Sequence, residues 1–406
     1  MRAYERLLNY VKVYTTSDED STTFPSTARQ FDLAKILVEE LKELGVSDAS
    51  VDDNCYVFGS IPATPGYEDK KAIGFIAHMD TAPDFCGENV NPIVEENYDG
   101  EDIVLGTSGR VIKVADFPHL KTLKGRTLIH TDGTTLLGAD DKSGIAEIMT
   151  FVEEIINSDT PHGKICIGFT PDEEIGAGPD HFDVEAFGAD FAYTVDGGAE
   201  NAVEYENFNA ASAKVVFNGV NIHPGDAKDI MVNAALVAME FNAMLPPTEV
   251  PSKTSGYEGF FHLIDMKGDV AKAELSYIIR DHDATKFADK KKVMEHACNI
   301  INQNYGEGTC ELTIKDQYQN MIEKIKPHMF LIDYAFQALK DAGENPEAVA
   351  IRGGTDGARL SFMGLPCPNL GTGGYNFHGP MEHITAEGMD TVVKVLHGII
   401  NLVAAE

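Results

Sequence analysis

Short apolar runs that alternate with amphipathic helical segments constrain the fold of this chain more than any other feature. Runs typical of strands lie at residues 72–77, 164–170 and 191–195, and helical spacing is found at 143–156 and 386–404. Such alternation is typical of an α/β layer whose sheet is largely parallel and flanked by helices. We therefore predict an α/β protein with a mixed, largely parallel core sheet.

The pattern changes in the middle of the chain. Strand patterns and two longer helical patterns follow one another between residues 207 and 320, and the α/β alternation returns after them. A separate unit of this kind is typical of a small α+β domain inserted into a larger one. We predict one large domain in two parts, 1–206 and 321–406, interrupted by an inserted domain at 207–320.

The charge of the chain restricts its partners. Among 406 residues there are 65 Asp and Glu against 32 Lys and Arg, a formal net charge of −33. Nucleic acid and anionic membranes would be repelled by such a surface, so we expect neither as a partner. We expect no segment long and apolar enough to span a bilayer, the N-terminus lacks the apolar core of a signal peptide, and none of the six cysteines forms a CxxC pair. These features predict a cytoplasmic protein with reduced thiols.

Acidic and histidine residues gather where the predicted strands end. Because open α/β sheets place their sites at the carboxyl ends of their strands, these side chains are expected to converge. The residues concerned are His78 and Asp80, the pair Asp140 and Asp141 before a helix, the pair Glu173 and Glu174, Asp196, and His378 near the end.

Nitrogen and carboxylate oxygen without sulfur suit zinc in an open, catalytic site. Asp140 is the predicted bridge between two ions, since a carboxylate can span a metal pair. Adjacent glutamates allow one to bind metal while the other acts as a base, and Asp80 can accept the second ring N–H of His78. Each motif taken alone is as typical of a turn or a helix cap, so composition and spacing leave both interpretations open.

Longer motifs decide between these interpretations, because together they resemble the peptidase T family of tripeptide aminopeptidases. This family is part of a superfamily of two-zinc exopeptidases that includes aminoacylase, carnosinase and glutamate carboxypeptidase. The matching stretches span nearly the whole chain; among them are Ala77-His-Met-Asp-Thr-Ala82, Leu137-Gly-Ala-Asp-Asp-Lys-Ser-Gly144, Phe169-Thr-Pro-Asp-Glu-Glu174, Tyr193-Thr-Val-Asp-Gly-Gly198, Ile351-Arg-Gly-Gly-Thr-Asp-Gly357 and Gly373-Gly-Tyr-Asn-Phe-His-Gly379.

The resemblance implies two zinc ions per subunit in the larger, catalytic domain, and an inserted lid domain. One ion would be bound by His78, Asp140 and Asp196, and the other by Asp140, Glu174 and His378. Glu173 would be the general base, Asp80 would hold His78, and the Asp140–Asp141 peptide would be cis. His383 is a competing ligand candidate, but His378 is favoured because it lies inside the matching motif.

The resemblance also implies roles for residues outside the metal site. In the lid, His223 would stabilise the oxyanion, and Arg280 would bind the substrate carboxylate, with Asn233 as a weaker candidate. Arg352 would line the pocket. A homodimer through the lid is plausible, because the superfamily commonly dimerises there.

These expectations define the predicted function and its alternatives. The preferred hypothesis is a metallo-aminopeptidase that releases the N-terminal residue from short peptides, above all tripeptides. A dipeptidase or an N-acyl amino acid amidohydrolase would use the same metal chemistry. A non-catalytic metal-binding scaffold is the alternative from another class.

Overall fold

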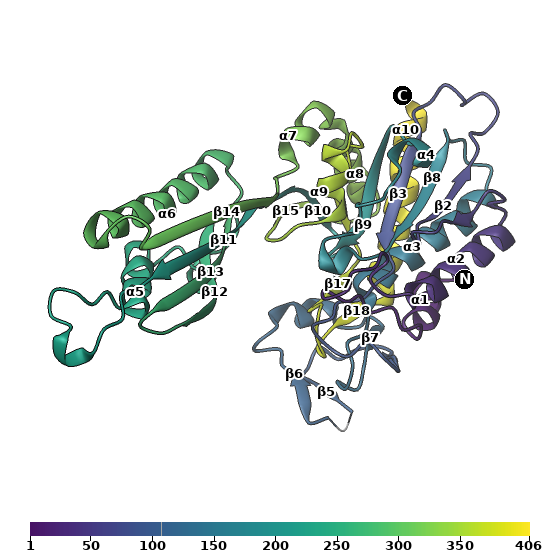
Figure 1. The fold of residues 1–406 in the computed structure, drawn as a ribbon. Helices are drawn as coiled ribbons and strands as arrows, with labels where there is room; N and C mark the ends of the chain where they lie inside the picture. Colours follow the sequence, from purple (N-terminus) through teal and green to yellow (C-terminus); the bar gives the residue numbers. More distant parts are fainter. Residues whose placement is uncertain (107) are drawn as a thin grey trace. The chain divides into compact units, whose positions relative to one another are not determined.

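Two compact units make up the protein in the computed structural model, which describes residues 1–106 and 108–406 (Figure 1). The first unit consists of Met1–Tyr205, Glu323–Val349 and Thr355–Glu406. The second consists of Glu206–Ile322 and Ala350–Gly354.

An eight-stranded mixed sheet forms the centre of the first unit. Four neighbouring strands are parallel, in the order β8, β3, β9, β16, and the pairs β1–β2, β2–β8 and β10–β16 are antiparallel. The predicted mixed, largely parallel sheet is confirmed. In spatial order the strands are β1 (Ser50–Val51), β2 (Val57–Ile61), β8 (Ile165–Thr170), β3 (Ile73–His78), β9 (Phe191–Gly197), β16 (Asn369–Gly371), β10 (Ala202–Asn207) and β15 (Glu347–Ile351).

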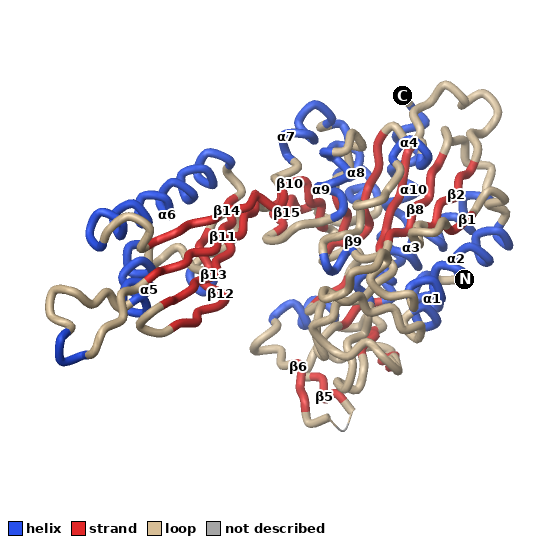
Figure 2. Tube along the Cα trace, viewed as in Figure 1, coloured by secondary structure: helices blue, strands red, loops and turns tan. Residues whose placement is uncertain are grey.

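Helices cover both faces of this sheet (Figure 2). On one face, α3 (Ala139–Ile156) packs on β3 and β9, α1 (Ala3–Tyr10) and α10 (Ala386–Ala405) pack on α3, and α8 (Phe330–Asp341) packs on α10. On the other face, a cluster of buried side chains joins the strands to α4 (Val184–Phe187) and α9 (Asp356–Phe362). The helix α2 (Gln30–Leu44) contacts α3, β1 and β2. Because both faces are covered, every residue of β3 and β8 is buried and their sequences read as continuous apolar runs.

One helix corrects an expectation about membranes. By length and composition, α10 is apolar enough to cross a bilayer, although we expected no such segment. More than half of its apolar stretch is buried inside the protein, and it packs on α1, α3 and α8. Because its apolar residues are buried against these three helices, α10 is a core helix of the first unit.

Residues 84–138 and the C-terminal segment form a smaller sheet that we did not predict. Its order is β17 (Gly374–Tyr375), β18 (His383–Thr385), β7 (Leu128–His130) and β4 (Ile93–Glu95), and a separate hairpin joins β5 (Ile103–Leu105) and β6 (Arg110–Ile112). Strands of two or three residues carry too little periodicity to be read from sequence. The connection between β17 and β18 carries His378.

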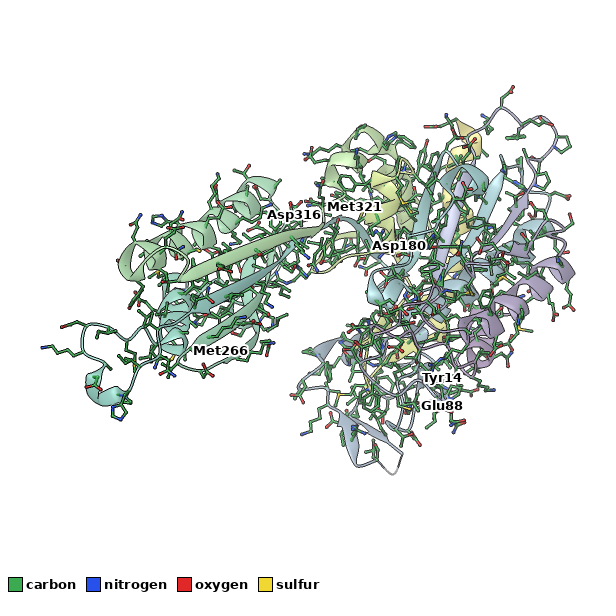
Figure 3. All side chains as sticks on the ribbon, viewed as in Figure 1. Tyr14, Glu88, Asp180, Met266, Asp316 and Met321 are labelled. Atoms are coloured by element: carbon green, nitrogen blue, oxygen red, sulfur yellow. The ribbon has the colours of Figure 1, made fainter. Side chains whose placement is uncertain are left out.

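The second unit is an antiparallel sheet with helices packed on it. The strands follow the order β12 (Phe260–Gly268), β13 (Lys272–Asp281), β11 (Asn209–Asn218) and β14 (Cys310–Tyr318). Figure 3 labels Met266 on the edge strand β12 and Asp316 on the other edge strand, β14. The helices α5 (Ala234–Met244) and α6 (Ala284–Tyr305) bury their apolar residues against the strands, and the short α7 (Ile322–Ile325) follows β14.

The boundary of the second unit corrects our division of the chain. We assigned all of 321–406 to the larger domain, but residues 350–354 belong to the second unit. The guanidinium of Arg352 donates hydrogen bonds to the main-chain oxygens of Thr254, Gly256 and Glu258 and lies over the rings of Phe208 and Phe260. These contacts are made by side chains far apart in sequence, which periodicity does not reveal.

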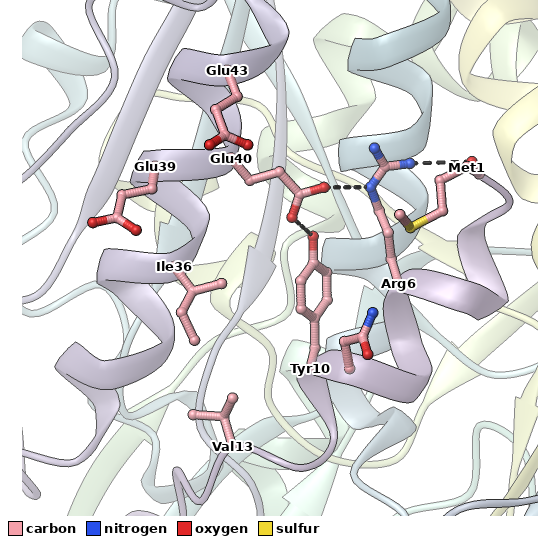
Figure 4. Close-up of a pocket in the computed structure, with 9 residues that line it drawn as sticks. Met1, Arg6, Tyr10, Val13, Ile36, Glu39, Glu40 and Glu43 are labelled. Carbon is pink, nitrogen blue, oxygen red and sulfur yellow. Dashed lines mark hydrogen bonds and ion pairs between the residues drawn. The ribbon is translucent and has the colours of Figure 1, made fainter.

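A pocket of about 380 Å³ lies between α1 and α2 (Figure 4). Three of its polar side chains, Arg6, Tyr10 and Glu40, are paired with one another. The buried Arg6 forms ion pairs with Glu40 and Glu153, and the hydroxyl of Tyr10 donates to Glu40 at 2.5 Å. These bonds hold α1 against α2 and α3. The paired side chains of the pocket therefore serve to stabilise the packing of the helices.

Candidate metal centre

The five predicted metal ligands lie together in the first unit. His78 Nε2 is 3.0 Å from Asp140 Oδ1 and 3.3 Å from Asp196 Oδ1. His378 Nε2 is 3.3 Å from Asp140 Oδ2 and 2.9 Å from Glu174 Oε2. The two oxygens of Asp140 therefore face two different histidines, as a carboxylate that bridges two ions would.

Parallel strands bring three of these side chains to one edge of the sheet. His78 is the last residue of β3, Asp196 lies near the end of β9, and the Glu173–Ile175 turn directly follows β8. Because β8, β3 and β9 are neighbours and run in the same direction, their carboxyl ends meet. Residues almost 120 positions apart in sequence thus reach the same place.

Two adjacent aspartates, Asp140 and Asp141, lie at the start of α3, and only one of them has a carboxylate that is free to bind a metal ion. The Asp140–Asp141 peptide is cis, and both residues depart from helical dihedral angles at the start of α3. His78 and Asp141 also form a group with Asp196 whose ligand atoms lie within 4.8 Å of one another. However, the Asp141 carboxylate already accepts the main-chain N–H groups of His78 and Gly144, at 3.1 and 3.2 Å. We therefore favour Asp140 as the ligand.

Asp80 has a wider role than we expected. The ring Nδ1 of His78 lies 3.1 Å from the main-chain oxygen of Asp80 and 3.3 Å from its carboxylate. The same carboxylate accepts the N–H groups of Glu173 at 3.0 Å and Glu174 at 3.2 Å. Asp80 thus joins the strand that holds His78 to the turn that holds both glutamates.

Glu173 is close to the cluster but forms no short contact with it. Its carboxylate is 4.0 Å from His78 Nε2, and its side chain is 17% exposed. Burial, and after it the charge of Asp196, raises the pKa of Glu173 well above its ordinary value. A carboxyl group with a raised pKa is suited to take and return a proton near neutral pH.

The charge balance and the donor set fit a pair of divalent cations. Burial, followed by the charge of Asp140, raises the pKa of Glu174 to about 8, and burial raises the pKa of Asp196 to about 6. Hydrogen bonds to Asp140 and Glu174 raise the pKa of His378 to about 11. Protonated imidazoles thus offset part of the negative charge of the clustered, buried carboxylates. Two divalent cations would offset more of that charge. Among the described residues, the buried Glu174 Oε1 has no hydrogen-bond partner, which leaves it able to bind an ion.

The structure also separates His383 from the cluster. His383 Nε2 lies 3.0 Å from His119 Nε2, and His383 Nδ1 donates to the Met381 main-chain oxygen at 2.8 Å. With both ring nitrogens engaged elsewhere, His383 is not a member of the candidate centre.

Three buried carboxylates near the centre were missed by the sequence analysis. Asp172 accepts hydrogen bonds from the main chain and hydroxyl of Ser26 and from Gln30. Asp356 accepts the Thr170 hydroxyl at 2.8 Å, and Glu382 accepts three main-chain N–H groups. In the sequence, each of these three carboxylates appears only as an acidic residue in or near a motif. Such a residue cannot be told from a solvent-exposed acid until its burial is known.

The four predicted residues of the lid and pocket, His223, Asn233, Arg280 and Arg352, all belong to the second unit. His223 is exposed, and its Nδ1 accepts the Gly225 N–H. Asn233 caps α5 by accepting the N–H groups of the following residues. The Arg280 Nη1 donates to the main-chain oxygens of Ala211 and Ile279. Their predicted roles toward substrate stay predictions.

Sequence comparison relates the whole chain to named proteins. Residues 205–309 match the family described as the peptidase dimerisation domain. The chain is 54% identical over 401 residues to peptidase T of Alkaliphilus oremlandii, covering 98% of both chains. It is 55% identical over 404 residues to peptidase T of Clostridium perfringens, covering 99% of both.

Solved structures share the fold. An aminopeptidase PepT from Bacillus cereus superposes with a TM-score of 0.79 at 21% identity, covering all of this chain and 98% of the other. A Bacillus subtilis protein titled a dinuclear metal binding peptidase from the M20 family superposes with a TM-score of 0.66 at 13% identity, covering 99% of each chain. The fold agrees with the sequence relatives, which are more than half identical over nearly their full length, and the chain belongs to the peptidase T family of enzymes.

Proposed function

We propose that this protein is a cytoplasmic aminopeptidase that removes the N-terminal residue from tripeptides with the help of two zinc ions. The observation that supports it most is the position of Asp140, whose two carboxylate oxygens face two different histidines. The names of the relatives support the substrate class, since a similar structure from Staphylococcus aureus, with a TM-score of 0.78, is titled a tripeptidase.

The proposed ligands follow from the contacts. His78, Asp140 and Asp196 would hold one ion, and Asp140, Glu174 and His378 would hold the other. When bound, two zinc ions would polarise the scissile carbonyl and lower the pKa of a water molecule at the site. The protein contributes a rigid set of ligands, because Asp80 and Asp141 fasten the surrounding main chain.

Glu173 is the proposed general base. Its carboxylate would accept the proton of the attacking water and later return that proton to the amine of the leaving peptide. Three features support this role. Glu173 is adjacent to a proposed ligand, and the Asp80 carboxylate fixes its main chain. No short contact ties its side chain to the other residues of the site, so it is free to face the water.

The substitution Glu173→Gln tests this function. We expect the variant to keep two equivalents of zinc and to lose at least about a hundredfold in kcat, since proton transfer by a positioned side chain contributes about 10²–10⁴-fold. Zinc content by atomic emission and hydrolysis of di-, tri- and N-acetylated peptides should be measured on the same preparation. Chelation followed by zinc replacement is the control for the parent enzyme.

Two results would contradict the proposal. Tripeptide hydrolysis by Glu173→Gln at the parent rate would remove Glu173 as the base. Preference of the parent enzyme for a blocked N-terminus would replace the aminopeptidase with an amidohydrolase.

We further propose a homodimer formed through the second unit. The match to a dimerisation domain at residues 205–309 supports this assembly. Exposed apolar side chains of the second unit also support it, namely Leu236 and Met239 on α5 and Ile264 and Met266 on β12.

A further inference from the structure

Glu382 joins the two segments that carry Asp140 and His378. It is only 2% exposed and lies at the end of the connection between β17 and β18, four residues after His378. Its Oε2 accepts the main-chain N–H groups of Leu137 at 2.7 Å and Gly138 at 2.8 Å. Its Oε1 accepts the N–H of Asp140 at 3.0 Å. One carboxylate therefore accepts three N–H groups from the four-residue segment 137–140, which lies more than 240 residues away in sequence.

These donors belong to a buried segment whose main chain is irregular at Gly138 and Asp140. Gly138 has a left-handed φ of 77°, and Asp140 has φ −81° and ψ 104°, so neither has helical dihedral angles. The first N–H groups of a helix lack partners within it and need an acceptor from elsewhere. Glu382 supplies that acceptor and thereby sets where the Asp140 main chain lies.

We propose that Glu382 is a positioning residue, which holds Asp140 midway between His78 and His378 and so sets the affinity of the centre for the ion shared by Asp140, Glu174 and His378. The inference rests on the proposed function and concerns a residue for which no role has been assigned. Glu382 touches neither ion nor substrate in this scheme. It fixes the main chain of Asp140 by hydrogen bonds. Because it lies four residues after His378, the same bonds also hold the segment that carries His378.

A carboxylate is needed here for a simple geometric reason. Three converging N–H groups require two acceptor oxygens, and a carboxylate has two. An amide of the same shape has one oxygen, and its NH₂ group would point at an N–H donor. Asp140 or the Leu137–Gly138 pair would then move away from Glu382, and the ligand set that includes His378 would open.

The experiment compares Glu382→Gln with Glu382→Asp and with the control Glu387→Gln. Glu387 is also a glutamate that accepts a main-chain N–H, that of Thr127 at 2.8 Å. It lies in the first turn of α10 and contacts none of the proposed ligands through that bond. Zinc binding to the metal-free full chain is measured by calorimetry, and kcat and KM for a tripeptide are measured with and without added zinc. Thermal unfolding of the metal-free variants reports folding independently.

We expect Glu382→Gln to bind one equivalent of zinc with parent affinity and the second at least tenfold more weakly. Its kcat should fall at low zinc and recover as zinc is added, while KM stays within twofold of the parent. Glu387→Gln should match the parent in zinc affinity and in the dependence of kcat on zinc. If Glu382→Gln does not fold, Glu382→Asp takes its place, because it keeps both oxygens but withdraws them from the Asp140 N–H.

The outcomes separate this inference from the proposed function. Parent-like binding of both equivalents by the folded Glu382 variants overturns the positioning role and leaves the aminopeptidase intact. A parent enzyme that binds two equivalents without cleaving tripeptides overturns the function, while the binding data still decide the role of Glu382. A parent that binds no zinc overturns both.

Discussion

At the scale of single residues, buried carboxylates around the centre do two different jobs. Some face the histidines, while Asp80, Asp141 and Glu382 accept main-chain N–H groups of the segments that carry ligands. Groups that orient ligands are often nearly as important to a metal site as the ligands themselves.

Asp80→Asn tests this bracing at the turn of Glu173 and Glu174. The amide keeps one acceptor oxygen and loses the other, so one of the two N–H groups at 3.0 and 3.2 Å loses its partner. We expect kcat to fall about 10–100-fold, the range found for partners of metal ligands. Steady-state kinetics at saturating zinc measures the change, and Asp53→Asn, on the exposed surface, is the control. An unchanged kcat would contradict the bracing role.

His383 makes the stability of the protein sensitive to acid. Burial lowers its pKa to about 4, and the nearby His119 and His130 also lower it. In the unfolded chain the pKa of histidine is about 6.5. The folded state therefore favours neutral His383, and its contribution to stability is present above pH 6.5 and lost as the pH falls toward 4.

We expect the free energy of unfolding of His383→Leu to depend less on pH than that of the parent. Between pH 7 and pH 5 the variant should lose about 2 kcal/mol less stability than the parent, from the difference between the two pKa values. Urea unfolding at both pH values measures this. His296→Leu, an exposed histidine on α6, should leave the parent profile unchanged. Equal losses in His383→Leu and the parent would show that His383 does not carry the effect.

Much of the site at this scale was predictable. The proposed ligands stand inside motifs that can be read directly, three of them at strand ends, Asp140 at the start of a helix and His378 in a connection. Glu382 and Asp172 were not predictable, because their partners are main-chain groups of irregular segments. Whether such an acid is buried depends on which distant segment folds over it, and no local pattern encodes that.

At the scale of elements, the packing of α10 on α8 depends on a glycine. A Cβ added at Gly398 would lie 2.8 Å from the Cβ of Ala338, closer than such atoms approach, and 3.2 Å from its Cα, which is also a tight contact. The two helices must therefore separate to accept a larger residue at position 398.

Overpacking usually costs about 1–3 kcal/mol, and alanine inside a helix gains up to about 1 kcal/mol over glycine. Gly398→Ala should therefore destabilise the protein by a net amount of up to about 2 kcal/mol. Thermal or urea unfolding measures the loss. Adding Ala338→Gly to the variant should recover part of it, since the facing methyl group is removed. A variant at least as stable as the parent would mean that the helices adjust without cost.

Prediction of the elements succeeded where they are long. The patterns at 191–195 and 386–404 correspond to β9 and α10 with small shifts. Helix starts are harder to read. Helical spacing in the sequence begins near residues 25 and 229, but α2 begins at Gln30 and α5 at Ala234. Residues just before each start have other partners: Ser26 binds Asp172, and Asn233 caps α5.

At the scale of the whole molecule, the proposed dimer makes a prediction about exposed apolar side chains. Leu236 and Met266 are 62% and 48% exposed, on α5 and on the edge strand β12. Leu236→Glu and Met266→Glu should shift the protein from dimer to monomer, because a charge in an apolar interface loses its hydration. Analytical ultracentrifugation measures the mass. Val104→Glu, at an exposed apolar residue of the first unit, should leave it unchanged. A monomeric parent would contradict the proposal.

The division of the chain was predicted in outline, since the change of pattern near 207 and 320 is strong. The return of residues 350–354 to the second unit was not, because it depends on Arg352 reaching oxygens of residues 254–258.

The place of Arg352 has a consequence for the order of events during synthesis. Translation delivers the main-chain oxygen of Thr254 to the ribosome exit 98 residues before its guanidinium partner. The nascent second unit, although its long segment ends at Ile322, stays incomplete until Gly354 has emerged. By then the ribosome has also made Glu323–Val349, but the first unit still lacks Thr355–Glu406, so the second unit is completed before the first although it begins later in the chain.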